Sequence, residues 1–175
     1  MPRRHPLPRL WLMTDERMGD ALWDALARLP HGSGVVFRHY GLAPAERQAL
    51  FARVLKIARR RRLVVVRAGS LSLRGESGMH GQRGRGLRTA PTHDRREAIA
   101  AQRAGAQALF VSPVFPTRSH PGAPALGRVR FGLLVRRLDV PVIALGGMDA
   151  RRARSLRPFG IHGWAAIDAW TRDSR

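Results

Sequence analysis

A pair of glycines separates an apolar run from a helical pattern late in the chain. Gly146 and Gly147 follow the apolar run Val140–Leu145 and precede Met148, near which a helix is expected to begin. Glycine lets the backbone approach a ligand closely, and the free N–H groups at the start of a helix attract anions. A strand-to-helix turn also needs glycine for purely structural reasons. The late place of this turn in an alternating α/β chain favours the first interpretation, so we expect the N–H groups of Gly146, Gly147 and Met148 to bind a phosphate.

A polar loop follows the strand expected near Ala108–Val111. Within residues 112–120, Thr117 and Ser119 carry hydroxyl groups, and His120 carries a cation when it is protonated. These groups suit a phosphate, because hydrogen bonds in which one partner is charged are the strong ones. A generic surface loop would have a similar composition, so the residue types alone leave both interpretations open.

The histidines are acid–base candidates, because the ordinary pKa of histidine lies close to neutral pH. His80 and His120 are expected near the mouth of the fold, where either could act as an acid or a base. His93 directly precedes Asp94, which opens a helical pattern, so a structural hydrogen bond is its expected role. A structural role is the better interpretation for most single histidines, and His120 is the main exception.

Strand-like apolar runs and helical patterns alternate along the chain. Strands are expected near residues 10–14, 35–38, 63–66, 78–80, 87–90, 108–112, 140–145 and 161–167. Several of these runs are apolar on both faces, which is typical of a parallel sheet covered by helices. A helix is expected from Pro44, with Phe51 and Val54 on its apolar face, and Asp94 with Glu97 marks another helix start.

Eight strand candidates predict an α/β fold, a closed (β/α)8 TIM barrel that forms one domain over residues 1–175. The chain is short for this fold, so the helices after the third, fourth and eighth strands are expected to be reduced. No GxGxxG pattern follows an early strand, which counts against a dinucleotide-binding fold. An open sheet with fewer strands is the alternative. In a barrel the functional residues lie on the loops after the strands, so the candidate segments are expected to share one site.

Composition limits the classes of partner. The chain has no cysteine and a formal net charge of +20, and Lys56 is its only lysine. This arginine bias reflects a GC-rich genome at least as well as function, and few aromatic residues accompany the arginines, so nucleic-acid binding is not expected. No apolar stretch approaches the roughly 18 residues of a membrane span, and the opening segment lacks the features of a secretion signal. We expect a cytoplasmic protein that binds a small phosphorylated substrate and no membrane; the sequence indicates no oligomeric state.

Four segments together resemble the thiamine phosphate synthase and thiazole tautomerase (TenI-like) family. They are Leu10–Asp15, similar to the family's LYLITD; Gly78–Gln82, similar to GVHLGQ with one residue fewer; Ala104–Thr117, similar to AGADYV…GPIFPT; and Pro141–Gly147, similar to PVVAIGG. The segments occur in the family's order and span nearly the whole chain. The resemblance implies a (β/α)8 barrel of thiamine biosynthesis.

That resemblance also implies chemistry. The synthases couple hydroxymethylpyrimidine diphosphate with thiazole phosphate and release pyrophosphate, with magnesium bound to the diphosphate. Related tautomerases bind the thiazole phosphate and aromatise it without magnesium. Carried over to this chain, the family pattern makes Arg38 a catalytic candidate and adds His80 and Gln82 to the groups that bind substrate. His120 is the other catalytic candidate, because it replaces a ligand-facing lysine of the family.

The chain departs from the family pattern where the diphosphate and magnesium would bind. The family's Gln-x-Arg-x-Lys after the second strand reads Val36–Tyr40, so only Arg38 is kept. The two magnesium carboxylates fall at Arg67 or its neighbours and at Gly84. Because Mg²⁺ needs carboxylate or phosphate oxygens, we expect no protein metal site here, although the family implies magnesium. Cations from Arg67, His39 or His120 are expected to compensate in part.

Two further departures concern single positions. His120 replaces the lysine that closes the family's loop after the sixth strand, and Asp168 replaces a small hydroxyl residue near the last helix. Three hypotheses remain open: a thiamine phosphate synthase-like protein without the usual magnesium ligands, a metal-free thiazole tautomerase-like enzyme, and a non-catalytic barrel that binds a phosphorylated metabolite.

Overall fold

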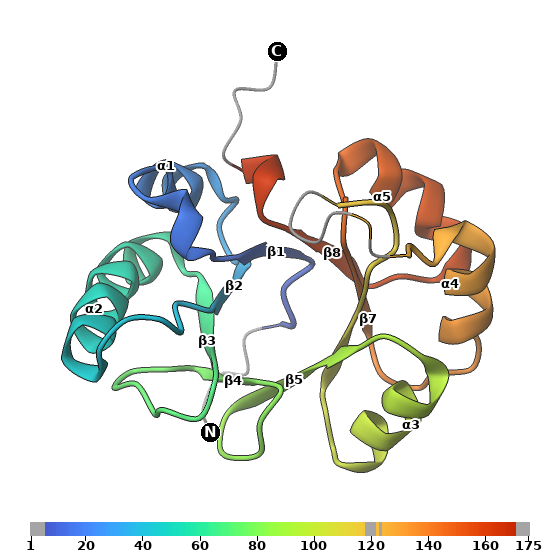
Figure 1. Ribbon diagram of the computed structural model, residues 1–175, viewed down its shortest axis with the longest axis horizontal. Helices are drawn as coiled ribbons and strands as arrows, with labels where there is room; N and C mark the ends of the chain where they lie inside the picture. Colours follow the sequence, from blue (N-terminus) through green and yellow to red (C-terminus); the bar gives the residue numbers. More distant parts are fainter. Residues whose placement is uncertain (1–5, 118–121, 123, 171–175) are drawn as a thin grey trace.

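The computed structural model describes residues 6–117, 122 and 124–170. Within them, eight strands form a closed, all-parallel barrel in chain order (Figure 1). The strands are β1 (Leu10–Met13), β2 (Gly34–Phe37), β3 (Val64–Ala68), β4 (Gly78–His80), β5 (Leu87–Thr92), β6 (Ala108–Val111), β7 (Val142–Leu145) and β8 (Gly163–Ala166). The sequence prediction of a (β/α)8 TIM barrel is confirmed, and the open sheet is excluded.

The helices cover only part of the barrel. They are α1 (Ala21–Arg28), α2 (Pro44–Arg61), α3 (Arg95–Arg103), α4 (Gly127–Val135) and α5 (Ala150–Leu156), with short 3₁₀ turns η1 (Glu16–Met18), η2 (Arg157–Phe159) and η3 (Asp168–Trp170). Figure 1 shows α1 and α2 on one side and α3, α4 and α5 on the other, with loops alone around β4. In the described part of the chain, β3 and β4 lead into loops and β8 into η3, as the length of the chain predicted.

The barrel interior is filled by side chains that alternate with those under the helices. Trp11 and Phe110 are fully buried at its centre, where their rings meet edge to face with centroids 5.2 Å apart. Gly34 lies beside them on β2, and a Cβ atom there would clash with the Trp11 ring. The Trp11 indole N–H donates to the carbonyl of Pro8 at 2.8 Å, which satisfies its one polar group. The interior is therefore a packed core below the cavity described next.

The helix starts follow from local sequence. The helix α2 begins at Pro44, a residue suited to the first turn because its fixed φ angle is helical and it has no N–H to satisfy. Asp94 accepts a hydrogen bond from the Glu97 N–H at 2.8 Å and so caps α3. Asp149 caps α5 in the same way, through the Arg152 N–H at 2.7 Å. These caps orient the loops that precede α3 and α5.

Strand ends differ from the prediction by at most two residues. The expected strand at 87–90 continues to Thr92, because pairing with β6 carries it through Pro91, which lies opposite Phe110. The expected strand at 161–167 is limited to Gly163–Ala166. No helix in the described ranges is long and apolar enough to cross a membrane.

Candidate functional site

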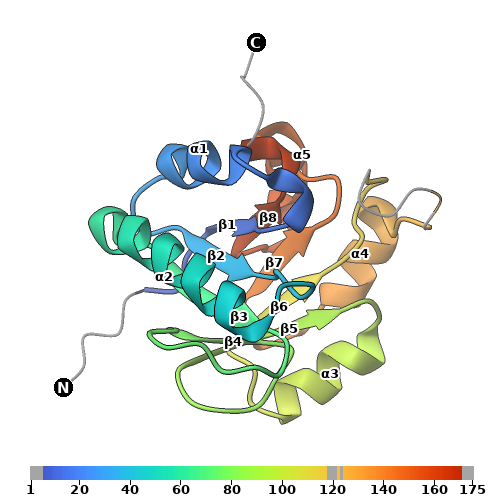
Figure 2. The same ribbon diagram turned by 60° about the vertical axis from the view of Figure 1, so that its left-hand side comes forward.

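A cavity of about 920 Å³ lies at the carboxyl ends of the strands. In Figure 2 the strand arrows point toward this end of the barrel. Seven residues singled out from the sequence line the cavity together: Arg38, His80, Gln82, Thr117, Gly146, Gly147 and Met148. The loops after β2, β4, β6 and β7 bring them together from distant parts of the sequence.

The glycine turn after β7 is built against the loop after β6. Gly146 and Gly147 have φ angles of +95° and +59°, a backbone conformation that favours glycine. The Val114 N–H donates to the Leu145 carbonyl at 2.9 Å, and the Phe115 N–H donates to the Gly146 carbonyl at 3.1 Å. A Cβ atom on Gly147 would meet the carbonyl oxygen of Pro116. Both the φ angles and the close approach of the two loops therefore require glycine here.

The same turn leaves two backbone donors unpaired beside the cavity. Within the described residues, the N–H groups of Gly147 and Met148 donate to no protein acceptor. Arg152 lies beside them: its guanidinium donates to the Gly147 carbonyl and its Cζ is 5.1 Å from the centre of the Phe115 ring. Asp149 also lines the cavity, but its carboxylate is engaged as the cap of α5. Unpaired N–H groups beside a cation form an arrangement that suits a phosphate.

Arg38 is held at the end of β2 by the loop after β1. Its Nε donates to the Thr14 carbonyl at 2.8 Å, and its Nη2 lies 3.3 Å from an Asp15 oxygen. The other terminal nitrogen, Nη1, has no partner in the described part of the chain. Burial lowers the pKa of Arg38, and Asp15 opposes that shift. Hydrogen bonding from Arg17 holds the pKa of Asp15 at about 2, so this carboxylate stays ionised and keeps Arg38 in place.

His80 lines the cavity from the end of β4. Its Nδ1 lies 2.9 Å from the Thr89 hydroxyl, and its ring meets the edge of Phe110 at 4.9 Å between centroids. Burial, with a smaller contribution from Arg38, lowers the pKa of His80 to about 4. The ring is therefore neutral at neutral pH, and it can exchange hydrogen bonds with a ligand without carrying charge.

Two of the three residues named as compensating cations, Arg67 and His39, do not line the cavity. Arg67 points away from the cavity, where its Nε lies 2.7 Å from a Glu76 oxygen and its guanidinium donates to the Gly69 carbonyl. His39 is also buried outside the cavity, stacked on Phe37 and 3.1 Å from the Thr14 hydroxyl, and burial lowers its pKa. Side chains alternate between the two faces of a strand, so Val66 and Ala68 face the interior while Arg67 faces outward, under the loop after β3.

The remaining predicted residues divide into two groups. Ser119 and His120 lie outside the described residues, as does the side chain of Asp168. His93 makes the structural hydrogen bonds predicted for it: its backbone N–H donates to Glu97 at 2.7 Å, and its Nδ1 lies 2.9 Å from the same oxygen. His93 also lines the cavity, which was not predicted.

Two further polar residues that line the cavity, Tyr40 and Arg152, were not predicted from the sequence. Tyr40 is 59% exposed at its mouth, two residues after Arg38 and so on the same side of the chain. Arg152 comes from the first turn of α5, three residues after the cap Asp149. The spacing from Arg38 and from Asp149 was the signal that could have indicated each of them.

The described residues do not fit a magnesium ion. They contain no group of three histidine, aspartate or glutamate side chains able to hold a metal. The ends of β3 and β4 contribute Gly69, His80, Gly81 and Gln82 to the cavity, with no carboxylate among them. Because Mg²⁺ is bound in proteins through one or two carboxylates besides phosphate oxygens, these residues do not form its site.

A closed parallel barrel with its cavity at the carboxyl ends of the strands belongs to the (β/α)8 class, in which ligands bind at that end. Within this class, residues 89–170 match the thiamine monophosphate synthase family. The chain is thus related to the thiamine phosphate synthase and TenI-like family, and the resemblance read from the motifs is confirmed.

Individual proteins agree with the family match. The chain is 42% identical over 73 residues to thiamine-phosphate synthase of Salinispora tropica and 34% identical over 73 residues to that of Pyrococcus furiosus. These alignments cover 41% and 42% of this chain and 35% of each relative, about a third of the relatives' length. The solved structure of thiamine phosphate pyrophosphorylase from Pyrococcus furiosus has a TM-score of 0.79 at 20% identity and covers 95% of this chain and 88% of that one. That likeness shows the shared fold.

Proposed function

We propose that this chain is a thiamine phosphate synthase-like protein of thiamine biosynthesis that holds a small phosphorylated ligand by the loops after β6 and β7. The observation that carries the proposal is the glycine turn, where Gly147 and Met148 line the cavity beside Arg152 and their N–H groups have no acceptor among the described residues. Thr117 lines the same wall, from the loop that packs against this turn. The family match covers both loops, since it spans residues 89–170.

The substitution Gly147→Val tests this site. A valine there clashes with the Pro116 carbonyl and is strained at a φ of +59°, so the turn must move away from the ligand. We expect binding of thiazole phosphate to weaken by about 1–3 kcal/mol, the scale of lost charge-assisted hydrogen bonds, when measured by isothermal titration calorimetry. Gly160→Val is the matched control: Gly160 has a φ of +71° and open space around it, away from the cavity. Equal binding by Gly147→Val and the parent would place the phosphate elsewhere.

We further propose that the chain does not use magnesium in the way the family implies. The residues at the ends of β3 and β4 that face the cavity lack carboxylates, and Arg67 points away from it. One lost charge-stabilising group commonly costs a factor of about 10²–10³ in rate. We therefore expect a poor magnesium-dependent, pyrophosphate-releasing synthase.

A second candidate is a metal-free thiazole tautomerase-like activity, which the state of His80 favours. The Thr89 hydroxyl is placed to donate to the Met79 carbonyl at 3.4 Å, an arrangement in which His80 Nδ1 carries the ring proton. The Nε2 atom is then an unprotonated base on a side chain that lines the cavity. The test is aromatisation of a thiazole phosphate tautomer, monitored by ultraviolet absorbance. We expect this activity to be lost in His80→Gln. If no turnover of either kind occurs while binding persists, the barrel binds its phosphorylated ligand without catalysis.

A further inference from the structure

Two exposed apolar side chains lie one turn apart on α4. Val129 is 76% exposed and Leu133 is 62% exposed. Residues i and i+4 of a helix share a face, so these two form one apolar strip on the outer side of α4. The core contacts of α4 come from other residues, Phe131, Leu134 and Val135, which are buried. A single exposed aliphatic residue is ordinary, whereas two adjacent ones on a helix that is already anchored indicate an interaction surface.

The elements next to α4 hold it without covering this strip. Phe159 of η2 packs against Gly132, where a Cβ atom would clash with its ring. Arg95 of α3 donates to the Arg136 carbonyl, just after α4, at 2.8 Å. Figure 1 shows α4 at the outside of the barrel between α3 and α5. Among the described residues, these contacts stabilise the flanks and the end of the helix and leave its outer strip exposed.

The strip is bordered by arginines. Arg128 and Arg130 lie on either side of Val129 in the chain, Arg136 and Arg137 follow the helix, and all four are exposed. Residues 127–138 contain no aspartate or glutamate. None of the four arginines forms an ion pair with a described carboxylate. A rim of unneutralised cations favours an anionic partner.

The carboxylates that follow α4 in the chain are engaged elsewhere. Asp139 exchanges hydrogen bonds with the side chain of Gln102 on α3, at 3.2 Å each. Asp149 caps α5. Further exposed cations on this side of the barrel come from α5 and η2: Arg151, Arg154 and Arg157.

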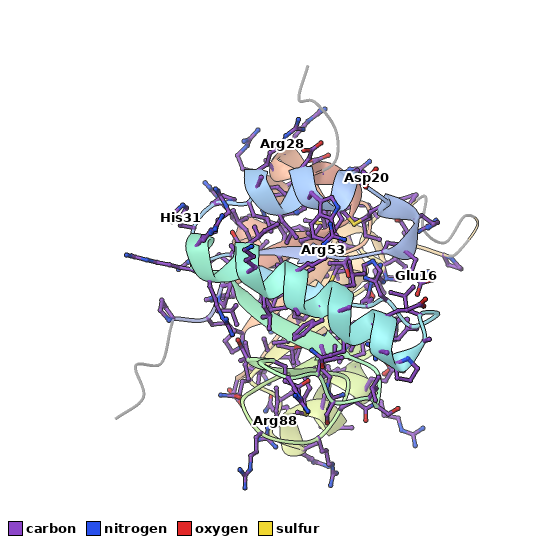
Figure 3. The ribbon with its side chains drawn as sticks, turned by 90° about the vertical axis from the view of Figure 1, so that its left-hand side faces the viewer. Glu16, Asp20, Arg28, His31, Arg53 and Arg88 are labelled. Carbon is purple, nitrogen blue, oxygen red and sulfur yellow. The ribbon has the colours of Figure 1, made fainter. Side chains whose placement is uncertain are left out.

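The opposite side of the barrel differs in both respects. Figure 3 shows charges of both signs around α1 and α2, with Glu16 and Asp20 on the same side as Arg28 and Arg53. The Trp23 ring on α1 is covered by Arg53, whose Cζ lies 4.3 Å from the ring centre. The combination of an uncovered apolar strip and cations without carboxylates therefore distinguishes α4 from these helices.

We propose that the strip of Val129 and Leu133, with its rim of arginines, docks an acidic segment of a protein partner. An amphipathic helix fits this surface, because its apolar residues would contact the strip while carboxylates beside them pair with the arginines. A second copy of this chain does not fit, since a two-fold contact would bring the same arginines face to face.

Two other anionic surfaces also fit poorly. Two aliphatic side chains on a nine-residue helix offer little apolar area to insert into a membrane. Single-stranded nucleic acid needs aromatic rings on which bases can stack, and the strip is aliphatic. A polypeptide that carries both apolar and acidic side chains matches both features of the surface.

The docking surface is connected to a wall of the cavity. The N–H of Leu126, directly before α4, donates to the Pro113 carbonyl at 2.9 Å, and Pro113 lines the cavity. Neither Val129 nor Leu133 is among the cavity-lining residues. The inference therefore goes beyond the proposed function and does not depend on it.

The probe is a synthetic helical peptide of about 15 residues, with two leucines one turn apart and glutamates on either side of them. Its binding to the full chain is measured by fluorescence anisotropy. We expect the double variant Val129→Ser, Leu133→Ser to bind it about tenfold more weakly than the parent, because apolar anchors at the centre of a contact provide most of its free energy. Leu71→Ser is the matched control: Leu71 is 39% exposed on the loop after β3, and binding should change by less than about twofold.

The arginine rim is tested in the same assay. Arg130→Gln should weaken binding by about threefold, and Arg60→Gln, which removes the same charge from an exposed position on α2, should have a smaller effect. Thermal melts check that each variant is folded, which is expected because the substituted side chains are exposed.

Several results would overturn the proposal. Equal binding of the peptide by the parent and the double variant would place the contact elsewhere. Equal binding of a control peptide with serines in place of its leucines would show a non-specific attraction to the net charge of +20. Dimerisation of the parent that the double variant abolishes, measured by sedimentation, would identify a second copy as the occupant. Binding to vesicles of anionic phosphatidylglycerol without binding to the peptide would identify a membrane surface.

Discussion

The two halves of the barrel line the shared cavity with different kinds of hydrogen-bond donor. In the second half, β5 to β8, Gly147 and Met148 line the cavity and their N–H groups have no acceptor among the described residues, and the family match covers this half almost entirely. In the first half, β1 to β4, the same cavity is bordered by the side chains of Arg38 and Tyr40. A backbone site depends on the path of the chain and tolerates much change of side chain. A side-chain site changes with each substitution, and the departures from the family lie mostly in that half.

The first half also contains the titratable groups whose pKa values differ most from their ordinary values. Burial lowers the pKa of His80 to about 4, from an ordinary value of 6.5. Between pH 6.5 and 4 the unfolded chain binds a proton that the folded chain does not, so stability falls as the pH falls through this window. At 1.36 kcal/mol per pH unit, the contribution of His80 is about 3 kcal/mol at most, and it is fully present above pH 6.5.

Urea unfolding at pH 7 and pH 4.5 measures this effect. His80→Gln should show a smaller loss of unfolding free energy between the two pH values than the parent. His39, whose pKa burial also lowers, contributes in the same direction and leaves part of the slope in place. An equal slope in His80→Gln and the parent would contradict the neutral, buried state of His80.

Alanine substitutions at the two helix caps of the second half are expected to have a smaller effect on stability, and they differ in their effect on ligand binding. Asp149 and Asp94 each accept one backbone hydrogen bond at a helix start, at 2.7 and 2.8 Å. Replacing either by alanine should lower the unfolding free energy by about 1 kcal/mol, as measured by urea unfolding. Asp149→Ala should also change the affinity for thiazole phosphate, because Asp149 lines the cavity and Asp94 does not. Equal affinity for thiazole phosphate in both variants would indicate that the ligand does not bind beside the glycine turn.

The sequence predicted the barrel well because apolar runs and helix starts are local signals. Pro44 and Asp94 begin their helices as expected, and all eight strands were identified. The direction of individual side chains was harder to predict. The family resemblance placed one magnesium carboxylate at Arg67 or a neighbouring residue, and a shift of one residue moves a strand side chain to the opposite face. That is why Arg67 was expected near the mouth and lies under the loops instead.

Arg47 illustrates what sequence patterns do not measure. It is four residues before Phe51 and seven before Val54, so helical spacing puts it on the buried face of α2. The spacing was a usable signal, but charge argued for exposure, since buried arginine without an ion pair is rare. Its buried Nε has no hydrogen-bond partner among the described residues, and this depends on the distances between α2, Phe37 and Tyr40, which only the folded chain defines.

The central claim is that the second half keeps the family's phosphate site while the first half lacks the residues for its magnesium chemistry. The direct measurement is coupling of hydroxymethylpyrimidine diphosphate with thiazole phosphate, detected as released pyrophosphate. It is made once with magnesium and once with EDTA. We expect binding of thiazole phosphate in both conditions and little or no magnesium-dependent turnover. Turnover that resists EDTA and is lost in Arg38→Ala would agree with arginines acting at the diphosphate. Robust turnover that EDTA abolishes would contradict the account, because the described residues would then have to hold a magnesium ion that they do not fit.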